Sequence, residues 1–327
     1  MRQIKEAAAI VIALAIVFCA TYVPAFLLTP VRTGYGAVWD LYRQEDTDSI
    51  DVLYLGSSMV YCDMIPAVVW EETGLSSFVM AGPGQTMSFT YYYLQEACKT
   101  QSPQAVVLEL SGMFFARYEG HTKSNITYMP WTMNRIRATL RAAEPEQRLG
   151  AFFPIYNYHD RVYTVTPGEL RARLFPGTDL YAGYTLLTTA SEQTGYPARD
   201  YSTDTEDYRS NLDYLEKIAA FCAEEDIPLV LYLAPVHYLI PEDTLRTLEQ
   251  DVSAVPHALY FNCNDGTWPA YDPVTDWYDA QHLNVYGAIP FSRQFGQTLM
   301  QLGLQPGQHD PALWQARLDA IQKYISP

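Results

Sequence analysis

Residues 51–63, DVLYLGSSMVYCD, combine a short apolar run with a polar turn. The apolar run from Val52 to Leu55 is typical of a strand that is buried on both faces of a sheet. It ends in Gly56-Ser57-Ser58, where a glycine permits backbone angles that other residues avoid. A strand that ends in Gly-Ser-Ser is usually only a polar turn, so Ser58 becomes a functional candidate only in combination with other residues.

Strand-like and helix-like segments alternate along most of the chain. Strands are predicted at 50–55, 77–80, 105–110, 228–234 and 259–261. Helices are predicted at 66–73, 87–98, 206–225 and 284–302, and the last of these closes the set. This alternation predicts a three-layer α/β/α sandwich, in which helices cover both faces of a mainly parallel sheet.

Residues from about 112 to 205 interrupt the alternation. This stretch is rich in Tyr, Arg, Pro and Thr and contains no strong strand run. We interpret it as an insertion into the α/β domain that shapes access to the substrate site. The predicted organisation is therefore a cytoplasmic stub and membrane anchor at 1–30, followed by one domain at 31–327.

The N-terminus carries an uncharged apolar stretch at 7–29, AAAIVIALAIVFCATYVPAFLLT. At a helical rise of about 1.5 Å per residue, about 20 residues span a hydrocarbon core of about 30 Å. Arg2 and Lys5 precede the stretch, which by the positive-inside rule places the main body outside the cytoplasm. We expect an uncleaved, single-pass signal anchor; the alternatives are a cleaved signal peptide and a buried core helix kinked at Pro24.

Charge and cysteine content limit the partners and the chemistry. The chain has 327 residues and a net charge of −16, which disfavours contact with phosphate backbones, so we expect no nucleic-acid partner. Of the five cysteines, Cys19 lies in the expected anchor, and the other four allow three disulfide pairings or buried thiols. None forms a CxxC pair, so the sequence does not support a zinc site or a redox motif.

A second polar motif, Asp279-Ala280-Gln281-His282-Leu283-Asn284, precedes the last predicted helix. A histidine can accept the proton of a serine hydroxyl, and an aspartate can fix the histidine tautomer and stabilise the imidazolium. Three positions apart, Asp279 and His282 can share one turn and reach the same site. The alternative is that Asp279 caps a turn while His282 is an exposed loop residue.

A third motif, Gly82-Pro83-Gly84-Gln85-Thr86, follows the second predicted strand. Glycines allow a backbone N–H to approach a developing oxyanion, and the N-terminus of a following helix favours negative charge. A phosphate-binding turn is the rival interpretation. The motif matches neither GxGxxG nor GxxxxGK[ST] and has no basic neighbour, which makes a nucleotide site improbable.

The order of these motifs resembles that of the SGNH (GDSL-like) hydrolase superfamily. The Gly-Ser-Ser form, the Pro-Gly-Gln-Thr block, the DxxHLN ending and the anchor are most similar to its DltD-type, O-acyltransferase-associated branch. The likeness covers roughly residues 50–109 and 228–302 and leaves the insertion unmatched. It implies a flavodoxin-like sheet and a Ser-His-Asp triad, with Ser58 as nucleophile, His282 and Asp279 as its partners, and Gly84 in the oxyanion hole.

The chain departs from the family pattern after the third predicted strand. The superfamily commonly places an oxyanion asparagine there, whereas this chain has Glu109-Leu110-Ser111-Gly112. Ser111 is therefore a candidate replacement donor. His237, just after the predicted strand at 228–234, is a further candidate because ligands of such sheets bind beyond the carboxyl ends of the strands.

The resemblance implies a membrane-anchored acyltransferase or esterase that acts on O-acyl esters of cell-envelope polysaccharides or teichoic-acid-type polymers. Neither a metal nor an organic cofactor is required for that chemistry. The resemblance also implies a partner, a multipass membrane-bound O-acyltransferase. Acyl transfer, ester hydrolysis and a non-catalytic scaffold that binds such a transferase or a surface glycan stay open as alternatives.

Overall fold

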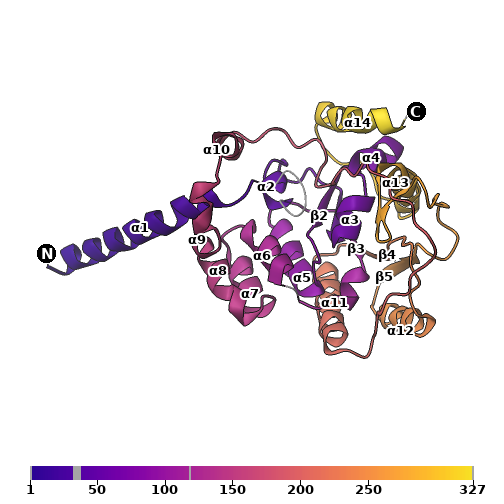
Figure 1. The fold of residues 1–327 in the computed structure, drawn as a ribbon, viewed down its shortest axis with the longest axis horizontal. Coiled ribbons are helices and arrows are strands. Elements are labelled where there is room, and N and C mark those ends of the chain that lie inside the picture. Colours follow the sequence, from indigo (N-terminus) through magenta and orange to yellow (C-terminus); the bar gives the residue numbers. More distant parts are fainter. Residues whose placement is uncertain (1, 32–37, 118, 326–327) are drawn as a thin grey trace.

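The computed structural model describes residues 2–31, 38–117 and 119–325. Its centre is a sheet of five parallel strands in the order β2-β1-β3-β4-β5 (Figure 1). The bounds are β1 Val52–Gly56, β2 Ser77–Ala81, β3 Ala105–Glu109, β4 Leu229–Leu233 and β5 Ala258–Asn262. Each agrees with a predicted strand to within two residues at either end, and the α/β sandwich with a parallel sheet is confirmed.

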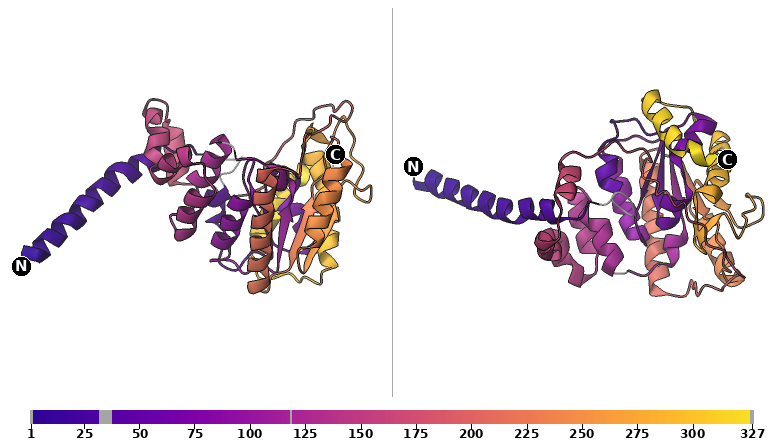
Figure 2. Two further views of the ribbon diagram at one scale, coloured as in Figure 1. Left: turned by 90° about the horizontal axis from the view of Figure 1, so that it is seen from below. Right: turned by 45° about the horizontal axis from the view of Figure 1, so that its top comes forward.

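Helices cover both faces of this sheet, as the two side views show (Figure 2). Along β1, Leu53 and Leu55 point into one buried apolar cluster, whereas Val52 and Tyr54 point into the other. The first cluster is covered by α2 Val38–Tyr42, α5 Met87–Ala97, α11 Glu206–Glu224 and α12 Glu242–Ser253. The second is covered by α3 Ser58–Asp63, α4 Pro66–Thr73 and α13 Val285–Met300. Helices therefore exclude water from both faces of the sheet, which explains why a strand such as β1 is a continuous apolar run.

The C-terminal part differs from the sequence-based prediction. Helix α13 begins after Asn284, whose Oδ1 accepts the N–H groups of Tyr286 and Gly287 as an N-cap. The prediction that this helix closes the fold is wrong, because α14 Pro311–Ile325 follows and packs on α4 and α13. A two-stranded antiparallel hairpin, β6 Trp277–Asp279 and β7 His282–Leu283, precedes α13 and was not predicted.

The segment between β3 and α11 is helical in its first half. Its α-helices are α6 Glu119–Thr127, α7 Met133–Arg141, α8 Arg148–Phe152, α9 Pro154–Tyr158 and α10 Pro167–Leu174. Three 3-10 turns accompany them: η1 Ser111–Phe114, η2 Pro145–Gln147 and η3 His159–Tyr163. These helices lie between the sheet domain and the N-terminal helix (Figure 1).

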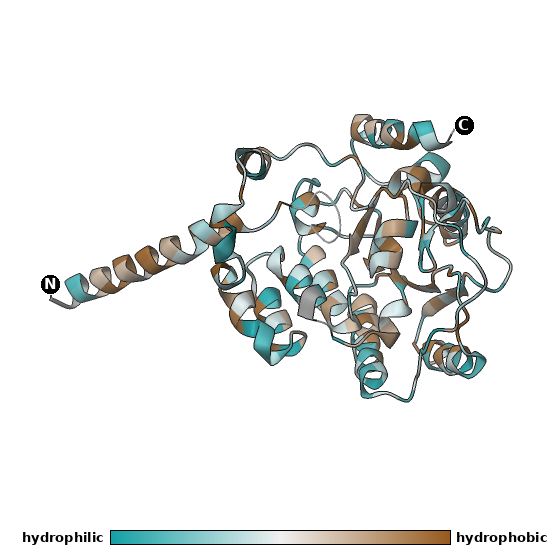
Figure 3. Cartoon of the chain, in the orientation of Figure 1, coloured by the Kyte–Doolittle hydropathy of each residue, from teal (hydrophilic) through white to brown (hydrophobic). Residues whose placement is uncertain are grey.

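Helix α1, Arg2–Leu28, projects away from the rest of the chain (Figures 1 and 2). Apolar residues run along most of its length (Figure 3). Residues 5–28 form a 24-residue segment that is long and apolar enough to cross a membrane, and only 6% of its most apolar window is buried. The alternative of a buried core helix is therefore wrong, and α1 is compatible with a signal sequence or an anchor.

Candidate active site

Ser58 is the first residue of α3, directly after the turn that ends β1. Gly56 has φ +143°, and a Cβ there would lie 2.8 Å from Val60 Cγ2 and 2.9 Å from Glu109 Cβ, so only glycine fits. Ser57 is the N-cap, and its Oγ accepts the Met59 N–H. The N–H of Ser58 belongs to the first turn of α3, where N–H groups have no partner within the helix.

The β6–β7 hairpin holds Asp279 and His282 opposite each other. Asp279 Oδ1 accepts the backbone N–H of Gln281 at 2.7 Å and that of His282 at 3.0 Å. The carboxylate therefore caps the turn, as the alternative interpretation of the motif proposed. It also contacts the imidazole, because His282 Nδ1 lies 2.9 Å from both of its oxygens.

The structure brings Ser58 and His282 together although they lie 224 positions apart in the sequence. Ser58 Oγ lies 2.8 Å from His282 Nε2. In the tautomer with a proton on Nδ1, the ring donates to Asp279 and Nε2 accepts the serine hydroxyl. The His282 side chain is 17% exposed and that of Asp279 44%, so a reactant can approach this chain of hydrogen bonds from solvent.

The electrostatics of Asp279 favour its ionised form. Burial raises the pKa of Asp279, but the hydrogen bond and charge of the His282 ring and the N–H groups of Gln281 and His282 outweigh it, so the net pKa is lowered. An ionised carboxylate at this point holds the Nδ1 proton of the imidazole. It leaves Nε2 as the atom that can accept a proton from Ser58.

The turn at Gly82-Pro83-Gly84 lies beside the Ser58 turn, because the Gly82 N–H donates to Gly56 O at 3.3 Å. Gly84 has φ +50°, and the ring of His121, from α6, occupies the space that a side chain at position 84 would need. Burial lowers the pKa of His121. A glycine is thus required at position 84 by both backbone conformation and space.

Asn125 and His121 are two residues near the site that the sequence analysis did not assign to it. Asn125 is buried against the same turn, with Nδ2 donating to Pro83 O at 3.3 Å and Oδ1 directed at Gly82. The two residues lie four positions apart on α6 and so share one face of the helix. This spacing is the one sequence signal that links His121 and Asn125. It does not reveal that their face of α6 packs on the Gly82-Pro83-Gly84 turn.

Glu109 forms a buried network behind the Ser58 turn that the sequence analysis did not identify. Its Oε2 accepts the hydroxyls of Ser111 at 2.5 Å and Ser57 at 3.3 Å, and its Oε1 accepts the Ser111 N–H at 2.7 Å. Burial raises the pKa of Glu109 to about 7, although the hydrogen bonds from Ser111 lower it. The Ser111 hydroxyl, a candidate oxyanion donor, therefore donates to a carboxylate and lies 3.1 Å from Ser57 Oγ, not beside Ser58.

His237 lies after β4, where the sequence placed it, but its ring is buried between aromatic side chains. The ring stacks on Tyr196 with centroids 4.2 Å apart and meets Trp277 of β6 edge-on at 5.4 Å. Its backbone N–H donates to Ala280 O at 2.9 Å, in the turn between Asp279 and His282. The contacts of His237 thus support the hairpin that carries the Asp–His pair.

Within residues 2–31, 38–117 and 119–325, no group of three or more His, Cys, Asp or Glu side chains could hold a metal ion. All five cysteines are free thiols, so none of the three possible disulfide pairings forms. A scan against protein-family models finds no match to this chain, and a search of curated proteins finds no relative. The geometry itself places a serine hydroxyl, an imidazole and a carboxylate in one chain of hydrogen bonds.

Proposed function

We propose that this chain is an SGNH-like serine esterase or O-acyltransferase with Ser58 as nucleophile, His282 as base and Asp279 as the residue that orients it. The observation that carries the proposal is the 2.8 Å separation between Ser58 Oγ and His282 Nε2, with Asp279 at 2.9 Å on the other ring nitrogen. Distances of about 2.6–3.2 Å are those at which a base can take a proton directly.

In the proposed reaction, His282 Nε2 takes the hydroxyl proton while Ser58 Oγ attacks the carbonyl carbon of an ester. The carbonyl π electrons move to oxygen, and the backbone N–H groups of Ser58 and Gly84 stabilise that oxyanion. The tetrahedral intermediate collapses, the bond to the leaving alcohol breaks, and the imidazolium gives its proton to that alcohol. An acyl group is then bound to Ser58 Oγ.

The second half of the reaction releases the acyl group. A polymer hydroxyl, or water in the case of hydrolysis, gives its proton to His282 Nε2 and attacks the acyl carbon. Ser58 Oγ leaves and recovers the proton from the imidazolium. Asp279 stays ionised throughout and stabilises the imidazolium each time it forms.

The site faces the cell envelope if α1 is an uncleaved anchor. Arg2 and Lys5 precede the apolar segment, which favours a cytoplasmic N-terminus and an extracytoplasmic α/β domain. This orientation and the family resemblance support esters of envelope polysaccharides or teichoic-acid-type polymers as substrates. They also support a multipass membrane-bound O-acyltransferase as a partner that supplies the acyl group.

The proposal is tested with purified full-length chain and an activated ester such as p-nitrophenyl acetate. We expect Ser58→Ala to lower kcat at least about 1,000-fold and Asp279→Asn about 100- to 10,000-fold, because each removes one part of a unit that acts together. The exposed Ser202→Ala is the matched control and should leave kcat unchanged. Equal kcat values for wild type and Ser58→Ala would show that the chain is not a serine esterase and would favour the alternative of a non-catalytic scaffold.

Product analysis separates transfer from hydrolysis. With an acetylated polymer as donor and a second polymer as acceptor, a transferase places the acyl group on the acceptor hydroxyl. If the acyl group appears only as free acid, the chain is an esterase. In both cases Ser58→Ala must abolish product formation.

A further inference from the structure

The C-terminal half of α1 packs against helices of the insertion. Tyr22 Oη donates to the backbone oxygen of Phe152 at 2.8 Å, and its ring meets that of Trp131 edge-on at 5.1 Å. Six residues further along, at the end of α1, the Arg161 guanidinium donates to Leu28 O at 2.7 Å. The insertion therefore contacts α1 over the last two turns of the helix, and not only at its C-terminal end.

This packing places part of the insertion at the depth of the bilayer. A hydrocarbon core of about 30 Å takes about 20 helical residues, so a core that begins at Ala7 ends near Phe26. Tyr22 then lies about 6 Å below the outer boundary, four residues at about 1.5 Å each. The Trp131 ring and the backbone oxygen of Phe152, which contact Tyr22, belong to the insertion and lie at the same depth.

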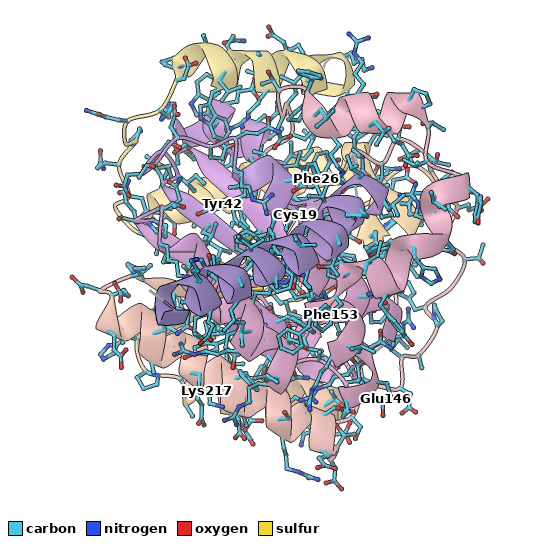
Figure 4. The ribbon with its side chains drawn as sticks, turned by 90° about the vertical axis from the view of Figure 1, so that its left-hand side faces the viewer. Cys19, Phe26, Tyr42, Glu146, Phe153 and Lys217 are labelled. Atoms are coloured by element: carbon cyan, nitrogen blue, oxygen red, sulfur yellow. The ribbon has the colours of Figure 1, made fainter. Side chains whose placement is uncertain are left out.

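The insertion exposes large apolar side chains on this side of the molecule. Phe153, on the face from which α1 projects, is labelled in Figure 4. Neighbouring side chains that are about half exposed or more are Trp131, Leu149, Tyr156, Val162 and Tyr163, the last 90% exposed. Trp and Tyr are the residues enriched where a membrane meets water. An exposed apolar group of this size on a domain surface indicates a contact surface.

The charge of this region is opposite to that of the remaining chain. Residues 131–163 contain five basic and three acidic residues, a net charge of +2. The remaining chain contains 16 basic and 34 acidic residues, a net charge of −18. A surface of anionic lipid headgroups attracts the first region and repels the second.

We propose that residues 131–163, here named the collar, form a second membrane contact that inserts through the headgroups and into the outer edge of the hydrocarbon core of an anionic phospholipid leaflet beside α1. This inference rests on the proposed anchoring by α1. A cavity of about 370 Å³ lies beside α1, between residues such as Phe18 and Phe26 and the segment that leads into the collar, and its lining also includes the charged Asp40, Arg43, Arg135 and Arg173. Two contacts instead of one fix the tilt of the α/β domain and the height of Ser58 above the leaflet.

Nitroxide quenching of site-specific fluorophores tests the collar in the full-length chain. The chain is reconstituted at one copy per lipid nanodisc, in a Cys19→Ala, Cys98→Ala background, with an NBD fluorophore on a single introduced cysteine. Tyr156→Cys and Val162→Cys report on the collar, Ile12→Cys on α1, and Val274→Cys on the far surface; all four native side chains are at least half exposed.

We expect nitroxides near the headgroup to quench the labels at positions 156 and 162 at least threefold more than the label at 274. Nitroxides placed deep in the acyl-chain region should quench the fluorophore at position 12 more than those at the other three positions. If position 12 is quenched while 156 and 162 behave like 274, the collar proposal is overturned and the anchor stands. Quenching at 156 that requires two copies per disc would instead assign the surface to a second copy of the chain.

Charge variants test the choice of an anionic leaflet. Arg137→Glu with Arg141→Glu, both exposed on α7, should lower quenching at position 156 severalfold in phosphatidylglycerol discs. The matched control, Arg209→Glu with Arg246→Glu on α11 and α12, should leave it unchanged. Equal effects of both pairs would overturn the proposed headgroup contact. An absence of quenching at position 12 would reject both the anchor and the collar. If the collar variants keep their esterase activity in that case, the proposed catalytic site still stands.

Discussion

Asp63, the last residue of the helix that Ser58 begins, accepts the backbone N–H of Leu283 at 2.9 Å. Leu283 is the neighbour of His282, so one buried carboxyl group joins the helix that begins with Ser58, the proposed nucleophile, to the hairpin that carries His282, the proposed base. Burial raises the pKa of Asp63 well above its usual value, which favours the neutral acid. Asp63 is therefore a positioning residue for the Ser58–His282 contact.

Removing the Asp63 carboxyl group should lower both the stability of the fold and the catalytic rate. Asp63→Ala leaves the buried Leu283 N–H without its acceptor, which costs about 1–3 kcal/mol of unfolding free energy. It should also lower kcat about tenfold or more with little change in KM, because the imidazole loses its alignment with Ser58. The isosteric Asp63→Asn keeps an acceptor oxygen and should retain most of both properties. If Asp63→Asn and Asp63→Ala lose kcat equally, the positioning role is refuted.

Glu109 should make the stability of the protein depend on pH. Its pKa is raised from 4.5 to about 7, so the folded state binds the proton more tightly than the unfolded state. The stabilisation is fully present below pH 4.5 and is lost as the pH rises through about 7. Since one pKa unit corresponds to about 1.4 kcal/mol, wild type should lose about 3 kcal/mol relative to Glu109→Gln across this range. Urea unfolding of both proteins at several pH values measures the difference, and parallel curves would contradict it.

Gly56 should tolerate no side chain. Gly56→Ala combines φ +143° with contacts below 3.0 Å to Val60 and Glu109, so we expect a loss of about 2–4 kcal/mol in unfolding free energy from strain and overpacking together. Gly168→Ala, on α10 with only Thr166 Oγ1 nearby at 3.7 Å, is the matched control and should be neutral or slightly stabilising. Thermal unfolding of both variants checks the comparison, and equal melting temperatures would show that the turn is not constrained.

The sheet and several helix ends could be predicted because local signals determine them. The predicted helix at 66–73 matches α4 at both ends, since proline favours the first helical position, which Pro66 occupies, and Gly74 adopts the left-handed C-cap with φ 75°. Strands β1 to β4 were found because burial on both faces makes them largely apolar, whereas β5 lies at the edge of the sheet and is only partly buried. Helix α3, in contrast, has six residues and begins inside the serine motif, which is too short for a periodic pattern to be visible.

The serine, histidine and aspartate could be proposed from motif order, but the residues that hold them in place could not. Glu109 and Asp63 are buried carboxyl groups, and nothing in the sequence distinguishes them from exposed ones. Their partners lie on other elements: Ser57 is 52 positions from Glu109, and Leu283 is 220 positions from Asp63. Such contacts are determined by tertiary packing. The same holds for His121 and Asn125, which come from an insertion without a recognised pattern.

The proposed activation of Ser58 by His282 can be measured by labelling with a fluorophosphonate. The probe phosphonylates an activated serine with loss of fluoride, and intact mass with peptide mapping identifies the site. We predict one label per wild-type chain, located on Ser58, none on Ser58→Ala, and a labelling rate at least about 100-fold lower for His282→Gln. A wild-type chain that stays unlabelled, or a His282→Gln chain that labels as fast as wild type, would contradict the account.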